Sequence, residues 1–238
     1  MHNTGLKPFA LVIGASGGIG AALLAQLQTD PHYAVTLGLS RRSTPALDLL
    51  DEASIAATAQ HVAALLAEQA GVLSLIVDAT GMLHTPTHLP EKSWAQLDAA
   101  QMAQAFAINA IGPALLMKHF LPLLPRQGTA VFATLSAKVG SIGDNRLGGW
   151  YSYRASKAAL NQLVHTAAIE LRRRAPQAIC VALHPGTVHS ALSQPFAKTG
   201  LDVRQPEVAA AQLLAVMADL KPEDSGGFFS FDGESLPW

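Results

Sequence analysis

Short apolar runs alternate along the chain with longer segments of helical pattern, beginning with the run at residues 9–13. Continuous apolar runs of this kind are typical of strands covered on both faces, and their alternation with helices indicates a parallel sheet. We predict further strands at residues 33–39, 46–50, 72–77, 129–135, 178–183 and 228–231, and long helices at 19–28, 55–68, 103–124, 151–174 and 206–220. The pattern predicts one α/β domain, residues 1–238, with a doubly wound parallel sheet of about seven strands and helices on both faces.

Composition narrows the class of protein. Half of the 238 residues are hydrophobic, 14% are charged and the net charge is -1, so no basic surface for nucleic acid is expected. The longest apolar stretch, residues 106–124, is interrupted by Asn109, Gly112 and Pro113, which argues against a membrane span. We expect no signal peptide, and we interpret the single cysteine, Cys180, as a small buried hydrophobe in a reducing compartment. These features predict a cytoplasmic protein without nucleic-acid or membrane partners.

A glycine-rich segment, Gly14-Ala-Ser-Gly-Gly-Ile-Gly20, directly follows the first predicted strand and opens the first predicted helix. Glycines at that place allow a tight turn and let a pyrophosphate approach the N–H groups of the helix. The spacing is ambiguous: one dinucleotide pattern uses Gly17 as its middle glycine, and another uses Gly18. Tight turns also use glycine for steric reasons alone. The position after the strand favours a nucleotide site that includes Gly14, Ser16, Gly18, Ile19 and Gly20.

The end of the second predicted strand carries information about the choice of cofactor. It reads Ser40-Arg41-Arg42, without the acidic residue that would hold a ribose 2′-hydroxyl. A guanidinium group matches the oxygens of a 2′-phosphate, whereas the alternative is an arginine on a solvated loop. Ser40 and Arg41 therefore favour NADP(H) over NAD(H).

Tyr153 and Lys157 are four residues apart at the start of the predicted helix 151–174, so they share one helical face. A phenol with a pKa of about 10 is a poor acid–base catalyst at neutral pH, and a neighbouring ammonium group lowers that pKa. The same lysine can donate to the ribose hydroxyls of a cofactor. Pairs with this spacing are common on helix surfaces, but this one follows the fifth predicted strand and its loop, which favours catalysis.

Two further polar residues are candidates for the same chemistry. Ser136, just past the fifth predicted strand, can hydrogen-bond a reacting oxygen, or it can simply cap the strand. Asn109 lies in a strongly apolar helical stretch, where an unsatisfied amide is costly. It can hold a water on a path from Lys157 to solvent, or it can mark a local helix defect beside Gly112-Pro113.

The glycine loop, Asn109, Ser136, Tyr153, Lys157 and the pair Pro185-Gly186 resemble the short-chain dehydrogenase/reductase superfamily in order and separation, over essentially the whole chain. The resemblance implies a Rossmann fold in which Tyr153 is the general acid/base and Lys157 anchors the cofactor. It also implies that Ser136 binds the substrate oxygen and that Asn109 belongs to a proton relay. The further cofactor contacts that it implies are Asp48 and Leu49 near the adenine, Ala79 and Gly81 after the fourth predicted strand, and Pro185, Gly186 and Thr187 near the nicotinamide.

Two segments of the chain resemble one particular subfamily, and two other positions differ from the usual pattern of the superfamily. Residues 109–113 and the chain end, residues 227–238, are similar to the C-factor/sniffer-type carbonyl reductases. Ile13 stands where the family has a threonine, and Asp78-Ala-Thr-Gly81 replaces its Asn-Asn-Ala-Gly. We expect Asp78 to take over some of the lost hydrogen bonds and Thr80 to restore a hydroxyl.

The substrate side is expected between two segments. Residues 184–205, which include Pro195 and Gly200, are predicted to form a mobile lid, and residues 138–150 the opposite wall. Trp150 and Tyr151 either contact the substrate or pack the helix start. His184 and His189 have neither cysteines nor paired carboxylates beside them, and Pro86 interrupts the helical spacing of His84 and His88, so no metal site is assigned.

Together these features predict an NADP(H)-dependent oxidoreductase that interconverts a small carbonyl compound and its alcohol by hydride transfer. A sugar-nucleotide epimerase is disfavoured by the short tail after the sixth predicted strand. A dinucleotide-binding signalling or regulatory protein with little turnover is a second alternative, which the C-factor resemblance permits. The intact set of Ser136, Tyr153 and Lys157 favours chemistry. The resemblance also implies a homodimer or homotetramer, paired through the helices 103–124 and 151–174.

Overall fold

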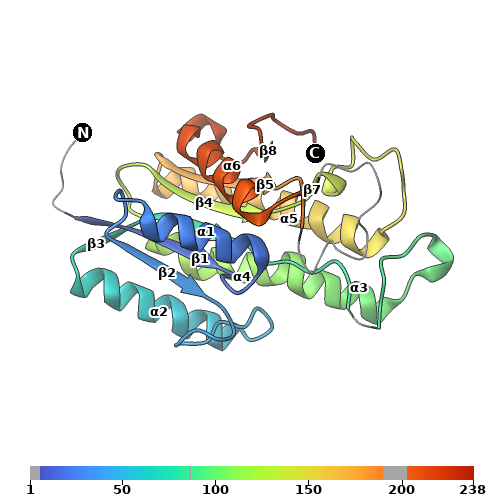
Figure 1. The fold of residues 1–238 in the computed structure, drawn as a ribbon, viewed down its shortest axis with the longest axis horizontal. Helices are drawn as coiled ribbons and strands as arrows, with labels where there is room; N and C mark the ends of the chain where they lie inside the picture. The colour runs from blue at the N-terminus through green and yellow to red at the C-terminus, as the bar shows by residue number, and fades with distance from the viewer. Residues whose placement is uncertain (1–5, 86, 190–202) are drawn as a thin grey trace.

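A parallel sheet of six strands forms the centre of the computed structural model, which describes residues 6–85, 87–189 and 203–238 (Figure 1). The strand order is β2-β1-β3-β4-β5-β8, and a separate parallel pair joins β6 to β7. The strands are β1 (Lys7–Ile13), β2 (Val35–Leu39), β3 (Gly71–Asp78), β4 (Ala130–Leu135), β5 (Ala178–His184), β6 (Thr187–Val188), β7 (Val203–Arg204) and β8 (Phe228–Ser230). This topology confirms the predicted doubly wound α/β fold.

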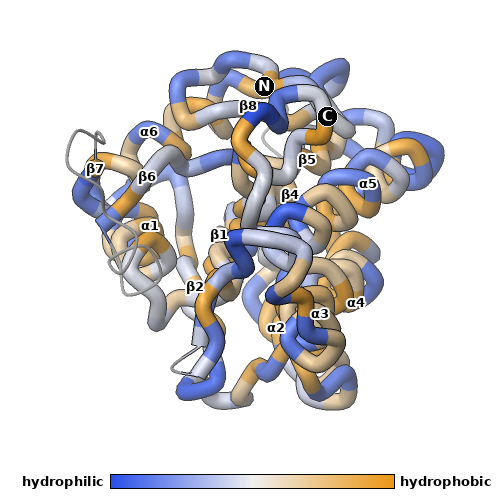
Figure 2. Tube along the Cα trace, turned by 90° about the vertical axis from the view of Figure 1, so that its right-hand side faces the viewer, coloured by the Kyte–Doolittle hydropathy of each residue, from blue (hydrophilic) through white to orange (hydrophobic). Residues whose placement is uncertain are grey.

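Helices cover both faces of the sheet, as the side view shows (Figure 2). One face carries α1 (Gly18–Thr29) and α6 (Pro206–Asp219). The other carries α2 (Glu52–Glu68), α4 (Gly112–Phe120) and α5 (Tyr151–Arg174). A fourth helix on that side, α3 (Ala99–Phe106), continues through a π-helical turn, Ala107–Ile111, into α4. Single 3₁₀ turns lie at Trp94–Gln96, Leu121–Leu123, Lys138–Gly140 and Pro222–Asp224.

The strand β1 shows why the apolar runs in the sequence are continuous. Its last five residues are all fully buried, and alternate side chains enter different cores. Phe9, Leu11 and Ile13 pack in the core beneath α2, α4 and α5, whereas Ala10 and Val12 pack beneath α1 and α6. Because both faces of the sheet are covered, neither set of positions can be polar.

The strand predicted at residues 46–50 is absent, and this prediction is wrong. The segment forms a loop in which Leu47 is buried and Asp48 makes a local turn. The Asp48 carboxylate accepts from the Leu50 N–H at 3.0 Å, and the Asp48 N–H donates to the Ser54 hydroxyl at 2.8 Å. These local bonds occupy backbone groups that a strand would use, so β2 is the edge of the sheet.

The helical region Ala99–Leu123 is apolar enough to suit either a membrane span or a protein core, and its packing decides between the two. Within the described residues, Ala99–Leu123 is the one helical stretch that is long and apolar enough to cross a membrane, judged by length and composition alone. Here it packs against the sheet, with Leu116 and Phe120 fully buried in the same core as β1. Core helices of globular proteins meet the same criteria of length and composition, so this stretch is a core helix in this fold.

Two other predictions have different outcomes. Cys180 lies fully buried in β5, as expected for a small hydrophobe. The predicted lid falls largely on residues 190–202, which include Pro195 and Gly200 and lie outside the described residues. Its two described ends meet, because Thr187 pairs with Val203 and Val188 with Arg204 in the β6–β7 pair.

Candidate active site

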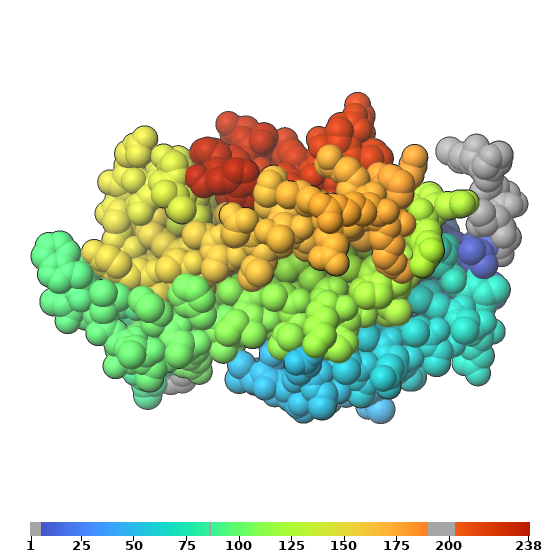
Figure 3. Space-filling view, turned by 180° about the vertical axis from the view of Figure 1, so that it is seen from behind, coloured from blue at the N-terminus to red at the C-terminus, as the bar shows by residue number. Residues whose placement is uncertain are grey.

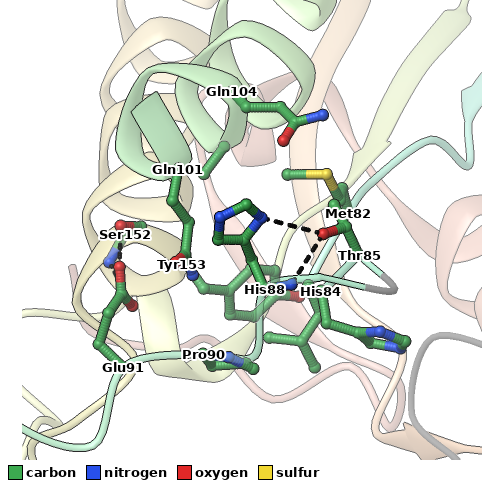
Figure 4. Close-up of a pocket in the computed structure, with 12 residues that line it drawn as sticks. Met82, His84, Thr85, His88, Pro90, Glu91, Gln101, Gln104, Ser152 and Tyr153 are labelled. Atoms are coloured by element: carbon green, nitrogen blue, oxygen red, sulfur yellow. Dashed lines mark hydrogen bonds between the residues drawn. The ribbon is translucent and has the colours of Figure 1, made fainter. Parts of the chain in front are cut away.

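The start of α5 positions Tyr153 and Lys157. The helix begins after Trp150, whose φ of 54° is rare for a residue with a side chain. No side chain of α5 caps its first turn. Instead the carboxylate of Glu91, from a distant loop, accepts hydrogen bonds from the N–H and the hydroxyl of Ser152 (Figure 4). The Glu91 carbonyl also accepts from the Trp150 N–H. A negative group at a helix N-terminus is favourable, so Glu91 fixes where α5 begins.

Lys157 is buried beneath the end of the sheet. Its side chain is 2% exposed, and Nζ donates to the Leu135 carbonyl at 2.8 Å. Burial lowers the pKa of Lys157 to about 8, and the charge of Asp78 acts in the opposite direction. An ammonium nitrogen carries three hydrogens, so the bond to Leu135 leaves two for other acceptors.

Tyr153 has the opposite pKa shift from the one expected from its spacing to Lys157. Burial raises the pKa of Tyr153 to about 12. The expectation of a lowered pKa is therefore wrong for the protein alone, because desolvation of the phenolate outweighs any effect of the lysine. The ring packs edge-on against Trp150, with centroids 6.2 Å apart. The phenol is consequently protonated at neutral pH.

Ser136 stands at the end of β4 and is 4% exposed. Its N–H donates to the Leu183 carbonyl at 2.7 Å, which ties it to β5. Its hydroxyl donates to Oδ1 of Asn161 at 2.6 Å. Asn161 lies one turn beyond Lys157 on α5, so the helix that carries Tyr153 also holds the serine.

Asn109 lies in the π-helical turn between α3 and α4. Its Oδ1 accepts from the Met82 N–H at 2.7 Å, and its Nδ2 donates to the Met82 carbonyl at 2.7 Å and to the Ser156 hydroxyl at 3.1 Å. The buried amide is thus satisfied by protein groups and joins the helix, the segment after β3 and α5. The expected local helix defect is present as this π turn, a feature frequently found at functional sites.

A cavity of about 390 Å³ joins the catalytic candidates to the predicted nicotinamide contacts. Ser136 and Tyr153 line it. From the predicted cofactor set it contains Ile19, Pro185, Gly186 and Thr187, and the predicted wall contributes Lys138, Val139, Asp144, Arg146, Leu147 and Trp150. Tyr151 is not among its lining residues. Arg154 anchors the wall, because its guanidinium donates to the carbonyls of residues 139, 148 and 149.

A second cavity, of about 400 Å³, gathers most of the other predicted cofactor contacts. It is lined by Gly14, Ser16, Ser40, Arg41, Asp48, Leu49, Ala79 and Gly81. Met82 lines this cavity and the next residue, Leu83, lines the first one, so the two cavities flank one segment. Gly18 and Gly20 line neither cavity and lie in the first turn of α1.

The glycine loop has the geometry of an anion cradle. Gly14 has a φ of +82°, which residues with side chains rarely adopt. A Cβ on Gly20 would lie 2.2 Å from the Gly14 carbonyl oxygen, so only glycine lets α1 approach β1 this closely. Gly17 is the N-cap of α1 and supplies no side-chain cap, which leaves the positive end of the helix to a ligand. The residues present fit a dinucleotide whose pyrophosphate lies over this turn.

Arg41 is exposed at the end of β2. Within the described parts of the chain its guanidinium makes no hydrogen bond or ion pair. Asp48, which lines the same cavity, has its carboxylate turned to its own loop through Leu50. The cavity therefore offers an uncommitted cation at the position where a 2′-phosphate is expected.

Local hydrogen bonds surround the two departures from the family pattern. The buried Asp78 carboxylate accepts from the Thr80 N–H at 3.0 Å, from the Thr80 hydroxyl at 2.6 Å and from the Thr134 hydroxyl at 2.7 Å. Burial raises the pKa of Asp78, while these bonds and the charge of Lys157 oppose the rise. The Ala79 N–H donates to the Ile13 carbonyl at 2.9 Å, so β1 and the turn after β3 are joined without a threonine.

Sequence reasoning missed two residues of this region, and it placed a third, His184, only at the start of the predicted lid. Glu91 and Asn161 carried no recognisable spacing, because their partners lie 61 and 25 positions away. His184 lines the catalytic cavity, and burial with the nearby charges of Lys138 and Arg204 lowers its pKa to about 4, so it is neutral there. A polar residue placed directly before Pro185-Gly186 was the only available signal for His184.

The chain is similar in sequence to a family of enzymes and to several known proteins. The sequence profile of a family described as enoyl-(acyl carrier protein) reductase matches residues 25–227. A C-signal protein of Myxococcus xanthus is 37% identical over 144 residues, which cover 60% of this chain and 81% of that protein. A 1-hydroxy-2-glutathionyl-2-methyl-3-butene dehydrogenase of Rhodococcus sp. (strain AD45) is 31% identical over 229 residues, covering 96% of this chain and 98% of that enzyme.

Solved structures agree with the sequence matches. An NADPH-bound carbonyl reductase from chicken fatty liver superposes with a TM-score of 0.83 at 25% identity, covering 98% of this chain and 99% of that one. The carbonyl reductase Sniffer of D. melanogaster shares the fold, with a TM-score of 0.82 at 21% identity over 98% of this chain and 100% of that one. Fold, site and matches define an oxidoreductase of the dinucleotide-binding α/β class. The chain belongs to the short-chain dehydrogenase/reductase superfamily.

Proposed function

We propose that the chain is an NADP(H)-dependent carbonyl reductase that also oxidises the corresponding alcohol. One observation carries the proposal: Tyr153, which is half-buried and protonated, and Ser136 line the same cavity as the segment Pro185–Thr187. A carbonyl oxygen in that cavity meets a proton donor and a hydroxyl at once. The NADPH-bound carbonyl reductase of similar fold supports the same reaction class.

In the proposed reduction each of four side chains, those of Tyr153, Ser136, Lys157 and Asn109, has a separate role. When bound, NADPH supplies the hydride that the carbonyl carbon receives. Tyr153 holds its proton at neutral pH and gives it to the carbonyl oxygen as negative charge develops there. Ser136 stabilises the same oxygen through its hydroxyl. Lys157 keeps two N–H groups for ribose hydroxyls beyond its bond to Leu135, and Asn109 holds the helix beside it in place.

The preference for NADP(H) rests on the second cavity. Arg41 is an exposed, uncommitted guanidinium, and the end of β2 carries no carboxylate that would repel a 2′-phosphate. Guanidinium groups bind phosphate oxygens through two parallel hydrogen bonds. A structure from Burkholderia multivorans with bound NADP has a similar fold, with a TM-score of 0.76 at 22% identity, and supports the choice of NADP(H).

The direct test is cofactor oxidation against a panel of aldehydes, ketones and quinones, with NADPH and NADH in parallel. We expect turnover with NADPH, weaker turnover with NADH, and loss of turnover in Tyr153→Phe with NADPH binding retained. Cofactor binding without turnover of any panel member, in wild type and variant alike, would contradict the proposal.

A signalling or regulatory protein with little turnover is the second candidate. The 37% identity to the C-signal protein of Myxococcus xanthus supports it. The two functions differ in what they require, because a sensor needs the cofactor cavity but not Ser136 and Tyr153. Binding of NADPH without reduction of any carbonyl would favour this candidate.

We further propose that two copies pair through α4 and α5. The two helices lie side by side on one face of the molecule (Figure 3), with a groove of about 460 Å³ between them. Met117, Leu121 and Leu163 line the groove, and Ile169 on α5 is 51% exposed. Exposed apolar side chains, such as Leu163 and Ile169 on α5, beside a groove between two helices are typical of a subunit interface. Light scattering is expected to give a dimer or tetramer mass, and a monomer would contradict the pairing.

A cytoplasmic location is also part of the proposal. The single cysteine, Cys180, is a buried free thiol, as suits a reducing compartment. Fractionation of cells that express the protein is expected to recover it in the cytoplasm, and recovery with membranes or outside the cell would contradict this.

A further inference from the structure

The hydroxyl of Ser136 has a partner that the proposed reaction does not use. Its oxygen lies 2.6 Å from Oδ1 of Asn161, and both residues are buried, with 4% and 2% of their surface exposed. Asn161 stands on α5 one turn after Lys157, on the helix that carries Tyr153. The pair therefore links the end of β4 directly to the catalytic helix.

A count of hydrogens shows what this contact does to Ser136. A serine hydroxyl has one hydrogen, and here the hydroxyl donates it to the amide oxygen of Asn161. A carbonyl oxygen, or the alkoxide that forms from it, can only accept hydrogen bonds. In this arrangement the Ser136 oxygen has no hydrogen to donate to the substrate oxygen. Two hydrogen-bond acceptors in contact repel each other. The hydroxyl must be redirected before it can stabilise the developing charge.

The amide nitrogen of Asn161, Nδ2, can redirect the Ser136 hydroxyl. This nitrogen is buried and has no hydrogen-bond partner within the described residues. A half-turn about the Cβ–Cγ bond exchanges Oδ1 and Nδ2, which places an N–H donor against the Ser136 oxygen and frees the hydroxyl hydrogen. Each orientation leaves one amide atom of Asn161 unpaired, so neither has an advantage in the number of hydrogen bonds. The substrate oxygen supplies the missing acceptor and favours the turned orientation.

We propose that Asn161 is a positioning residue that sets the direction of the Ser136 hydroxyl, and that its amide turns when a carbonyl binds so that Ser136 donates to the substrate oxygen. This inference rests on the proposed reductase function. Asn161 lines neither the cavity that contains Ser136 and Tyr153 nor the second cavity, so its effect passes through Ser136.

Two substitutions separate this role from simple packing. Asn161→Asp keeps the volume, but its ionised carboxylate only accepts and holds the hydroxyl hydrogen permanently. Asn161→Ala opens a small cavity but leaves the hydroxyl free to turn. Relative to the wild type at the same pH, which accounts for the titration of Lys157, we expect kcat to fall about 100-fold in the aspartate variant at about pH 9 and about tenfold in the alanine variant. The aspartate variant should recover towards about pH 6, where a protonated carboxyl can donate. A packing role predicts the reverse order, because alanine removes more contacts.

The double-mutant cycle with Ser136→Ala is the decisive kinetic control. Because Asn161 acts through Ser136, neither variant should lower kcat further once the hydroxyl is absent. NADPH affinity, measured by fluorescence, should stay unchanged throughout. Losses that add in the Ser136→Ala background, or an alanine variant slower than the aspartate variant at every pH, would overturn the inference. Absence of turnover by the wild-type protein would instead overturn the proposed function.

A spectroscopic measurement needs neither turnover nor a variant at position 161. The chain has four asparagines, at positions 3, 109, 145 and 161, so a sample labelled with nitrogen-15 only at asparagine gives four side-chain amide pairs, without the overlapping signals of glutamine. Adding para-nitrobenzaldehyde to the NADP⁺ complex, which cannot react, should shift one buried amide pair and slow its exchange with water. The same addition to Ser136→Ala should leave that signal unmoved. An unmoved signal in the wild-type complex would contradict the turn of the amide.

Discussion

The two ends of the proposed cofactor cleft differ in how their side chains are held. At the catalytic end Asn109, Ser136 and Lys157 are all buried, and each is bonded to a protein group from another element. At the other end Arg41 is exposed and makes no bond to any described residue. Buried polar groups need partners, whereas an exposed guanidinium is satisfied by water and can exchange that water for a ligand.

If the proposed function is correct, this difference predicts that chemistry and cofactor choice are carried by separable parts of the molecule. Substitutions at the catalytic end change stability as well as rate, because they leave buried partners unpaired. Substitutions at Arg41 should change which cofactor binds and little else.

Tyr153→Phe should lower kcat for carbonyl reduction by about 10²- to 10⁴-fold, because it removes the proton donor and leaves the ring in place. NADPH affinity should change little. Steady-state kinetics together with cofactor titration measures both quantities. A variant that keeps most of its kcat would show that another group supplies the proton.

Lys157→Met should change how stability depends on pH. Burial lowers the folded pKa of Lys157 from 10.5 to about 8, so between these values the unfolded chain holds a proton that the folded one has released. The unfolding free energy of the wild type should therefore rise, relative to the variant, as the pH increases through this window, by about 3 kcal/mol at most. Urea unfolding at a series of pH values measures it. A pH-independent difference would contradict the low pKa.

Gly20→Ala tests the close approach of α1 to β1. The added Cβ would lie 2.2 Å from the Gly14 carbonyl oxygen, so helix and strand must separate. We expect a loss of about 2 kcal/mol in unfolding free energy and weaker cofactor binding. Gly128→Ala is a contrasting control, since no atom lies within 4 Å of its Cβ and only its φ of +85° opposes the change. Equal effects on cofactor binding at both positions would contradict the cradle.

Arg41→Ala should weaken NADPH binding about tenfold through the loss of charge-assisted hydrogen bonds, with NADH binding and stability nearly unchanged. Arg42→Ala is the matched control, because its neighbouring guanidinium does not line the cavity. Equal losses for the two variants would mean that the preference comes from general positive charge.

Most of the fold could be predicted because strands that are buried on both faces have continuous apolar sequences, as in residues 9–13. The segment 46–50 looked similar, but Asp48 uses its carboxylate to close a local turn, a choice that a hydrophobic pattern does not show. Spacing located Tyr153 and Lys157 on one helix, yet it gave the wrong direction for the tyrosine pKa, because burial depends on the complete fold. Glu91 and Asn161 were missed for the same reason: tertiary packing alone brings each to its partner.

The most direct test compares Tyr153→Phe and Arg41→Ala in one experiment that measures kcat and the Kd for NADPH with a single carbonyl substrate. The separation of chemistry from cofactor choice predicts that the tyrosine variant loses kcat and keeps its Kd. The arginine variant should lose affinity and keep its kcat at saturating NADPH. Loss of both quantities in both variants, or the reverse assignment, would contradict it.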